Sequence, residues 1–336
     1  MIREAIDKIV RNNDLTELEA EAVMSEIMEG KASPSQISAF ITALRMKGET
    51  VPEITGCARV MRRMVTSIHT RHEFLVDTCG TGGDGAHTFN ISTVSAFVAA
   101  GAGVIIAKHG NRSVSSKCGS ADLLEELGVN IEAPINVVEK CLDDVGIGFL
   151  YAPLLHMSMK YAGPVRKEIG IRTVFNILGP LTNPAGAKAQ VLGVYDPVLT
   201  SVMARVLGNL GSEEAWVVHG CDGLDEITTT GKTKISRCKN GKIEELFLDP
   251  YEYGFNIAEK KDLSGGDRVA NAKIAMGVLT GEKSSARDIV VFNAAVAIVC
   301  GRKAENIKDA IMSAKESIDT GKALDKLKEL IKITKG

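Results

Sequence analysis

FLVDTCGTGGDGAHTFNISTVSAFVAAGAGVIIAKHG, residues 74–110, is the stretch that decides the fold. A short apolar run leads into a glycine-rich loop, and an apolar segment of helical length then leads into a second short apolar run. Strand, loop, helix and strand in this order build parallel sheets, because parallel neighbours need a crossover connection. We expect strands at 74–78 and 103–110, and a helix that starts near Ser92 or Thr93.

The same alternation continues toward the C-terminus. Strand-like runs recur at 147–151, 189–197 and 214–220, with helical patterns between them. Residues 232–248 predict a β-hairpin, because Asn240-Gly241 is a preferred two-residue turn. The last ~65 residues have helical periodicity. The fold class is therefore α/β, with a mostly parallel central sheet.

Before residue 70 the pattern is helical only. Three N-terminal capping pairs occur in succession, namely Thr16 with Glu19, Ser33 with Gln36, and Thr50 with Glu53. We expect a small helical domain over residues 1–70, joined by helices from about 162–185. Residues 71–336 then form the α/β domain. Apolar helix faces beyond the needs of one short bundle suggest a homodimer through the helical domain.

Composition narrows the class of function. The formal net charge of −2 gives no electrostatic reason to expect a nucleic acid or a membrane surface as partner. The seven cysteines are scattered and never spaced C-x-x-C, which favours the reducing cytoplasm over a disulfide or zinc framework. No uncharged apolar run approaches the ~20 residues that span a bilayer.

The glycine loop spells G-x-G-x-x-G at Gly80, Gly82 and Gly85, but its surroundings do not fit a dinucleotide site. A Rossmann helix starts at the third glycine, and an acidic residue lies ~20 positions further on. Here the helix starts several residues late, and the second strand ends in Lys108 to Arg112. A Walker A loop is also excluded, because Gly231-Lys232-Thr233 precedes the predicted hairpin instead of a helix.

Two loops therefore predict an anion site at the carboxyl ends of parallel strands. The first supplies glycine N–H groups, hydroxyls and a helix N-terminus. The second supplies fixed positive charge and serines. Asp84 lies among these anion-binding groups, which makes sense if a divalent cation accompanies the phosphate. Asp225 and Glu226 follow the strand at 214–220 and are candidates for the same metal.

Four segments in order carry a resemblance to a known family. They are GTGGDGAHTFNIS (80–92), KHGNRSVSSKCGSAD (108–122), GPVRKEIGIRTVFNILGPLTNPA (163–185) and GLDEIT (223–228). Together they closely resemble the anthranilate phosphoribosyltransferase family, over nearly the whole chain. The resemblance implies the nucleoside-phosphorylase-like fold and, as a rule, a homodimer.

The resemblance also implies a reaction. The phosphoribosyl group of 5-phosphoribosyl 1-diphosphate (PRPP) passes to the amine of anthranilate, giving N-(5-phosphoribosyl)anthranilate and diphosphate. This is the second step of L-tryptophan biosynthesis from chorismate. Mg²⁺ is the implied cofactor, as two ions with PRPP. An arylamine is already nucleophilic when neutral, so we expect no general base, and Lys108 and Asp84 would act electrostatically.

Site residues carry over by match to the family motifs. Those implied for PRPP are Gly80, Gly83, Asp84, Thr88, Asn90, Ile91, Ser92, Thr93, Lys108, His109, Gly110, Asn111, Arg112, Ser113, Val114, Ser115, Ser116 and Ser120. Those implied for anthranilate are Gly80, Asn111 and Arg166, and those implied for Mg²⁺ are Ser92, Asp225 and Glu226.

Several alternatives stay open at this point. A pyrimidine nucleoside phosphorylase shares the fold but has T-G-G-T-x-D-K-x-E where this chain has KCGSADLLEELG. A nucleic-acid-binding relative would have lost Asp225, Glu226 or Arg166, and another aromatic acid could replace anthranilate. His156 either borders the acceptor pocket or packs in the core. Arg172 could simply pair with Glu168 at i, i+4.

Overall fold

A seven-stranded sheet forms the centre of the protein in the computed structural model, which describes residues 1–113 and 117–336. The strand order is β3-β2-β1-β4-β5-β6-β7. The strands are β1 (Val76–Gly80), β2 (Ile106–Gly110), β3 (Ile147–Tyr151), β4 (Ala189–Gly193), β5 (Glu214–Gly220), β6 (Thr233–Lys239) and β7 (Lys242–Leu248). The first five strands are parallel to one another. Strand β6 pairs antiparallel with β5, and β7 pairs antiparallel with β6.

The strand order creates a switch point between β1 and β4. The chain runs outward from β1 through β2 to β3, and then returns to place β4 on the other side of β1. Loops that leave β1 and β4 therefore diverge to opposite sides, and open α/β sheets bind ligands in the crevice that results. The predicted glycine loop leaves β1 at this point.

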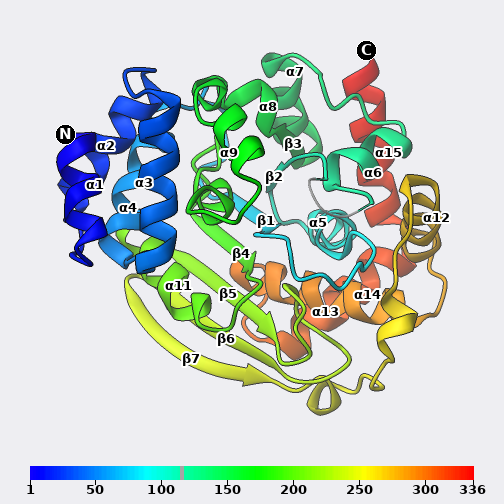
Figure 1. The fold of residues 1–336 in the computed structure, drawn as a ribbon. Helices are drawn as coiled ribbons and strands as arrows, with labels where there is room; N and C mark the ends of the chain where they lie inside the picture. Colours follow the sequence, from blue (N-terminus) through cyan, green and yellow to red (C-terminus); the bar gives the residue numbers. More distant parts are fainter. Residues whose placement is uncertain (114–116) are drawn as a thin grey trace.

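Helices cover both faces of the sheet (Figure 1). The central helix α5 (Ile91–Gly101) packs against α13 (Ser285–Cys300), α14 (Ile307–Asp319) and α15 (Lys322–Lys335) on one face. On the other face α11 (Leu199–Asn209) packs on β5 and β6. The remaining helices on the sheet domain are α6 (Ser120–Glu126), α7 (Ile135–Lys140), α8 (Ala152–Leu155) and α12 (Arg268–Leu279). Short helical turns are η1 (Cys141–Val145), η2 (Met157–Lys160), η3 (Gly179–Leu181), η4 (Pro250–Tyr253) and η5 (Lys260–Leu263).

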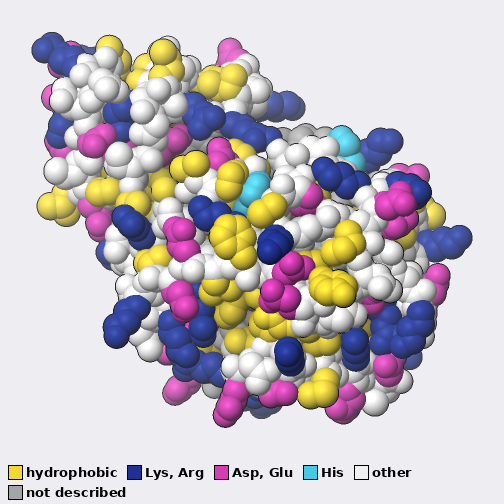
Figure 2. All heavy atoms as spheres, turned by 90° about the horizontal axis from the view of Figure 1, so that it is seen from below, with side chains coloured by type: hydrophobic (Ala, Val, Ile, Leu, Met, Phe, Trp, Pro, Cys, Tyr) yellow, Lys and Arg dark blue, Asp and Glu magenta, His cyan; other side chains and the backbone are white. Residues whose placement is uncertain are grey.

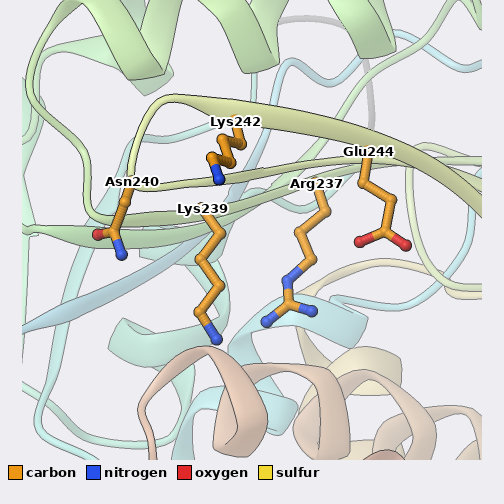
Figure 3. Close-up of a pocket in the computed structure, with 5 residues that line it drawn as sticks. All are labelled: Arg237, Lys239, Asn240, Lys242 and Glu244. Carbon is orange, nitrogen blue, oxygen red and sulfur yellow. The ribbon is translucent and has the colours of Figure 1, made fainter.

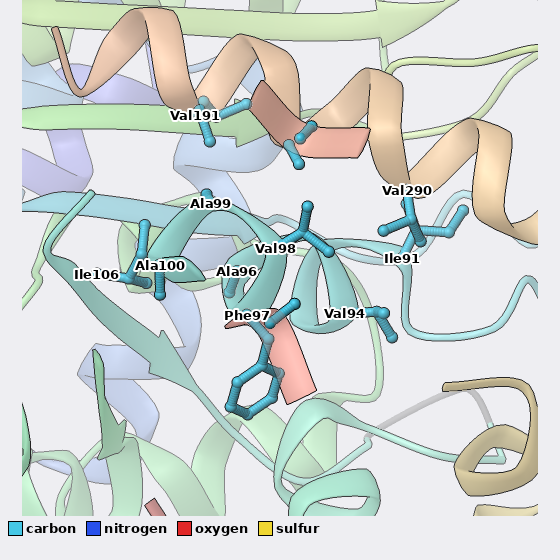
Figure 4. Packing of buried hydrophobic residues seen from close by; sticks show 14 of the residues in the cluster. Ile91, Val94, Ala96, Phe97, Val98, Ala99, Ala100, Ile106, Val191 and Val290 are labelled. Carbon is cyan, nitrogen blue, oxygen red and sulfur yellow. The ribbon is translucent and has the colours of Figure 1, made fainter. Parts of the chain in front are cut away.

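Helix α5 is apolar on nearly every side, and this sets the position of its N-terminus. Val94, Phe97 and Val98 lie in the same buried cluster as Val191 of β4 and Val290 of α13 (Figure 4). A helix that is apolar all round is buried in a core. Its first turn is thereby fixed against β1 and β2.

Four N-terminal helices form the bundle that the capping pairs predict. They are α1 (Ile2–Val10), α2 (Glu17–Met28), α3 (Pro34–Lys47) and α4 (Val51–Met64). The Thr16 and Ser33 pairs form capping boxes, and the Glu53 carboxylate accepts from the Thr50 N–H at 2.8 Å. Two later helices, α9 (Gly163–Ile169) and α10 (Phe175–Leu178), contribute to the same apolar cluster as the bundle. The domain boundary at residue 70 stays a prediction.

The predicted hairpin is confirmed, since β6 and β7 meet at Asn240 and Gly241, with φ of 48° and 78°. Two successive positive φ values are those of a type I′ turn. On the face in Figure 2, acidic, basic and hydrophobic side chains are interspersed. Within the described residues, no helix combines the length and apolar character that a membrane crossing requires.

Candidate active site

The glycine loop is tied at its base to β4 and to the loop after β5. Thr81 N–H donates to the Gly193 carbonyl at 2.9 Å, and the Tyr195 N–H donates to Thr81 Oγ1 at 3.2 Å. The Gly82 N–H donates to Asp225 Oδ2 at 2.9 Å. These bonds join strands that are distant in sequence and fix where the loop leaves β1.

At its tip, the loop presents unused donors. Gly82, Gly83 and Gly85 have φ of 65°, 83° and 73°, values that favour glycine. Within the described residues, the N–H groups of Gly83, Asp84 and Gly85 donate to no protein acceptor. Successive N–H groups left free in a turn of this kind form an anion-binding nest.

The far side of the loop is braced before α5 begins. Thr88 forms an isolated bridge with Ser264, and the Phe89 N–H donates to the Leu263 carbonyl at 3.2 Å. Helix α5 starts at Ile91, one or two residues before the predicted start and six after Gly85, so the Rossmann spacing is indeed absent. Asn90 Oδ1 and Thr93 Oγ1 are buried without a protein partner among the described residues. Buried polar atoms of this kind need a ligand or water partner.

Lys108 is buried directly under this first turn. It is 3% exposed, and its ammonium donates to the Thr78 carbonyl and to Ser92 Oγ at 3.3 Å. Burial lowers the Lys108 pKa, while the neighbouring Asp77 carboxylate acts in the opposite direction. Burial also raises the pKa of Asp77 to about 6. Asp77 Oδ1 accepts the His109 N–H at 3.1 Å, so this carboxyl group holds the end of β2.

Three acidic side chains meet at the other side of the loop. Asp84 Oδ2 accepts the Asp225 N–H at 3.4 Å, and Glu226 Oε1 accepts the Ser92 N–H at 3.2 Å. Burial and then the nearby Asp84 raise the pKa of Asp225 to about 7. Burial and then the Asp225 charge raise the pKa of Glu226 to about 8. Carboxylates that are partly buried and repel one another are stabilised by a shared cation.

The donor set fits Mg²⁺ that is completed by a substrate. Among the described residues, no group of three or more His, Cys, Asp and Glu side chains forms a metal cage. Mg²⁺ is commonly held by one or two carboxylates together with substrate phosphates and water. Asp225 and Glu226 supply the carboxylates, and Ser92 Oγ lies beside the Lys108 ammonium.

The second loop follows β2 and is tied to α6. Arg112 forms ion pairs with Asp122 and Glu125, each at 2.9 Å, and these partners raise its pKa. The Ser113 N–H donates to Asp122 Oδ2 at 3.1 Å. The Asn111 carbonyl accepts from Ser120 Oγ at 3.2 Å. Arg112 is thus partly neutralised, which the sequence did not indicate. The predicted residues Val114, Ser115 and Ser116 lie outside the described residues.

Gly110 ends β2 and leaves no room for a side chain, because a Cβ there would lie 2.3 Å from Ser120 Oγ. Gly80, at the end of β1, is similarly confined by Asp225, whose Oδ2 would lie 2.7 Å from a Cβ. These two glycines let the strand ends approach the loops closely.

On the acceptor side, Arg166 is half-buried on α9 and lies over the Phe175 ring at 5.2 Å. Burial lowers its pKa, and no described acidic side chain forms an ion pair with it. An unpaired, partly buried guanidinium is suited to a carboxylate ligand, which it can bind through two N–H groups.

A buried histidine pair lies at the end of β2. His109 Nε2 and His156 Nε2 are 3.1 Å apart. Burial lowers the pKa of His109 to about 3, with the charges on His156 and Lys108 adding to the effect, and burial lowers the pKa of His156 to about 4. Both rings are therefore neutral near pH 7. His156 is buried and packs against His109, which is one of its two alternatives, and a place beside the acceptor stays a prediction.

The alternative that Arg172 simply pairs with Glu168 is not what the structure shows. Helix α9 ends at Ile169, and Gly170 has φ of 68°, so Arg172 lies beyond the helix and the i, i+4 geometry is lost. Its guanidinium donates to the Gly83 carbonyl and lies 4.3 Å from the Tyr195 ring centroid. Nothing local indicated these contacts. Asp77 could have been found, because an acid inside an apolar strand is unusual.

Two hollows differ in their relation to this site. A void of about 10 Å³ under the loop is bordered by Ser92, Glu226 and Asn293, and is at the lower limit of what admits one water molecule. A larger hollow of about 350 Å³ lies at the β6–β7 hairpin (Figure 3). Arg237 in that hollow already pairs with Glu214 at 2.6 Å. The larger hollow contains no predicted site residue.

Comparison with known proteins identifies the protein family to which the chain belongs. Residues 72–324 match the α/β domain of the glycosyl transferase family, and residues 3–65 match the helical bundle domain of that family. The chain is therefore a glycosyl transferase family member. Its predicted fold class, with a helical N-terminal part and a large α/β part, is confirmed.

The particular family follows from individual relatives. Anthranilate phosphoribosyltransferase from Pelotomaculum thermopropionicum is 58% identical over 99% of this chain and 97% of its own. The structure of the Thermus thermophilus enzyme has a TM-score of 0.93 at 40% identity, with 99% of both chains covered. The Saccharomyces cerevisiae enzyme in complex with PRPP and Mg has a TM-score of 0.89 at 29% identity, covering 99% of this chain and 98% of its own. The chain belongs to the anthranilate phosphoribosyltransferase family, which confirms the predicted enzyme class and reaction.

Proposed function

We propose that this chain transfers the phosphoribosyl group of PRPP to the amine of anthranilate, and that it does so at the crevice between β1 and β4. One observation carries the assignment of the site. Free N–H groups of the glycine loop adjoin the Asp84–Asp225–Glu226 cluster, so groups that bind anions lie next to groups that repel them. A phosphate and a divalent cation that bind together satisfy both sets at once.

The glycine loop and the first turn of α5 bind PRPP in this proposal. The N–H groups of Gly83, Asp84 and Gly85 donate to phosphate oxygens. Thr88, Asn90 and Thr93 add side-chain oxygens, of which two are buried and unpartnered. Gly110, Asn111, Arg112, Ser113 and Ser120 border the same crevice from the second loop. Arg112 must exchange at least one acidic partner to reach a phosphate.

Mg²⁺ is the proposed cofactor, with two ions for each PRPP, and the similar Saccharomyces cerevisiae enzyme is described in complex with PRPP and Mg. Asp225, Glu226 and Ser92 would hold it, and when bound it offsets the charge of the departing diphosphate. Lys108 contributes a fixed ammonium under the same site. The buried amine also holds Ser92 Oγ in place, since it donates to that oxygen.

The acceptor is bound by its carboxylate and needs no proton acceptor of its own. Arg166 takes the carboxylate of anthranilate, and Gly80 and Asn111 border the amine. His109 and His156 are neutral and hydrogen-bonded to one another, so they shape the acceptor side without taking a proton. Charge stabilisation of the leaving group supplies the main rate effect.

In this proposal the protein is a cytoplasmic homodimer that associates through its helical bundle. The seven cysteines are all free thiols, which a reducing compartment preserves. Val10, Leu18 and Met46 expose apolar side chains on α1, α2 and α3. Apolar side chains grouped on one surface favour self-association.

The test is loss of anthranilate fluorescence in the presence of PRPP and Mg²⁺, with EDTA as the metal-removal control. Arg166→Ala should raise the anthranilate KM about 10- to 100-fold with kcat nearly unchanged, since a charged hydrogen bond is worth about 1.5–3 kcal/mol. Arg166→Lys keeps the positive charge but cannot donate two parallel hydrogen bonds to a carboxylate. Its anthranilate KM should lie between those of wild type and Arg166→Ala. Turnover that survives EDTA would contradict the metal assignment, and an unchanged KM in Arg166→Ala would contradict the acceptor site.

A further inference from the structure

Arg172 makes two contacts that join parts of the site otherwise separate in the fold. Its guanidinium donates to the carbonyl of Gly83, at the tip of the glycine loop. It also lies 4.3 Å from the ring centroid of Tyr195, which follows β4. A cation at this distance from an aromatic ring is attracted to its face. The guanidinium is thus held by two partners, although the residue is exposed.

Residue 83 must be a glycine for the Arg172 guanidinium to reach its carbonyl. A Cβ on Gly83 would lie 2.7 Å from Arg172 Nη2, so any other residue would displace the guanidinium. Gly83 also has a positive φ of 83°. The Gly83 N–H is free to bind a phosphate while the carbonyl of the same residue accepts from Arg172.

The segment that carries Arg172 also carries the acceptor arginine. Arg166 on α9 and Phe175 on α10 flank it, and both helices pack with the N-terminal bundle. In Figure 1, α9 lies between the bundle and strands β1 and β4. Within the described residues, the Arg172–Gly83 hydrogen bond is the one hydrogen bond between residues 163–178 and the glycine loop.

We propose that Arg172 is a positioning residue that couples the two substrate sites. A ligand that orders the glycine loop fixes the Gly83 carbonyl, and Arg172 then fixes the segment that presents Arg166. Binding at the donor loop should therefore tighten binding of the acceptor carboxylate, and the reverse must hold by linkage. This inference rests on the proposed function.

The experiment measures that coupling without turnover. Anthranilate is titrated by its own fluorescence into the full-length protein, with and without saturating Mg²⁺ and diphosphate. The wild-type Kd for anthranilate should fall at least about fivefold when diphosphate is present, the lower end of typical coupling. We define the coupling ratio as the Kd for anthranilate without diphosphate divided by the Kd with it. In Arg172→Gln this ratio should be close to one, with the Kd for anthranilate alone within about twofold of wild type. Arg172→Lys, which can still donate to the Gly83 carbonyl, should restore part of the ratio.

Arg302→Gln is the matched control. Arg302 is also exposed and stacked on an aromatic ring, with its guanidinium 4.0 Å from the Phe74 centroid, but it lies away from the loop and pairs with Glu213. It should keep the wild-type ratio. A wild-type ratio of one, or an unchanged ratio in Arg172→Gln, would overturn the coupling. Turnover of anthranilate with PRPP, measured in parallel, separates that result from failure of the proposed function, in which neither turnover nor anthranilate binding occurs.

Discussion

At the scale of single residues, the buried histidine pair links the site to stability. Both rings keep pKa values of about 3 and about 4 in the folded chain, below the ordinary value near ~6.5. The unfolded chain therefore binds protons that the folded chain does not. The free energy of unfolding falls as pH drops through the window from about 6.5 to about 4. Asp77, with a raised pKa of about 6, acts in the opposite direction.

His156→Gln should remove one of these groups and flatten that pH dependence. Between pH 7 and pH 5, His156 alone lowers the free energy of unfolding by about 2 kcal/mol. We expect the free energy of unfolding of the variant to fall by about 1–2 kcal/mol less than that of wild type over this pH range. Urea unfolding at pH 7, 6 and 5 measures the difference. Asp77 is present in both proteins, so its contribution cancels when their pH dependences are compared. Equal slopes for the two proteins would show that the folded chain binds the proton at His156.

At the scale of elements, the end of β4 can lie against the loop after β5 only because Gly193 has no side chain. A Cβ on Gly193 would overlap the carbonyl oxygen of Asp225, because the loop after β5 crosses directly over the end of β4. The same glycine accepts the Thr81 N–H through its carbonyl. Strand β4, the glycine loop and the acidic loop therefore meet at one residue.

Gly193→Ala should displace the Asp225–Glu226 loop. We expect the free energy of unfolding to fall by about 1–3 kcal/mol, as for other overpacked sites. We also expect kcat/KM to fall about 10²-fold, since site groups shifted by about 1 Å lose this much. Gly231→Ala is the control, because a Cβ there meets open space outside the site. Urea unfolding and a Mg²⁺ titration of turnover test both effects, and wild-type kcat/KM in Gly193→Ala would refute the constraint.

Local patterns predicted most elements because their causes are local. Capping pairs, the Asn240-Gly241 turn and the alternation of strands and helices each depend on residues a few positions apart. The glycine loop and the Asp225-Glu226 pair were found by their chemistry at strand ends. The Arg172–Gly83 contact and the overlap at Gly193 were not, because each joins residues far apart in sequence. The pairing of Arg112 with α6 depends on a turn geometry that charge alone does not specify.

At the scale of the whole molecule, the helical bundle presents its apolar surface at one end. Lys8 pairs with Glu19 at 2.8 Å and Lys47 with Asp14 at 2.7 Å, which brings together the end of α1, the start of α2 and the end of α3. Val10, Leu18 and Met46 lie in these same segments and are 69%, 77% and 84% exposed. In the proposed homodimer these side chains would meet their own copies across a two-fold axis, as in an isologous interface.

The double variant Leu18→Asp, Met46→Asp should therefore be a monomer, because the two new carboxylates would be buried against their own copies in the dimer. Light scattering after size-exclusion chromatography should give half the wild-type mass. Met312→Asp changes another exposed methionine, on α14; this variant should stay dimeric and controls for the added charge. The proposed donor, metal and acceptor residues all come from one chain, so we expect the monomer to keep kcat/KM within about threefold. A wild-type monomer at micromolar concentration would contradict the dimer, and a double variant that remains a dimer would place its contact elsewhere. A monomer without activity would instead mean that the bundle contact is needed to hold α9 and Arg166 in position.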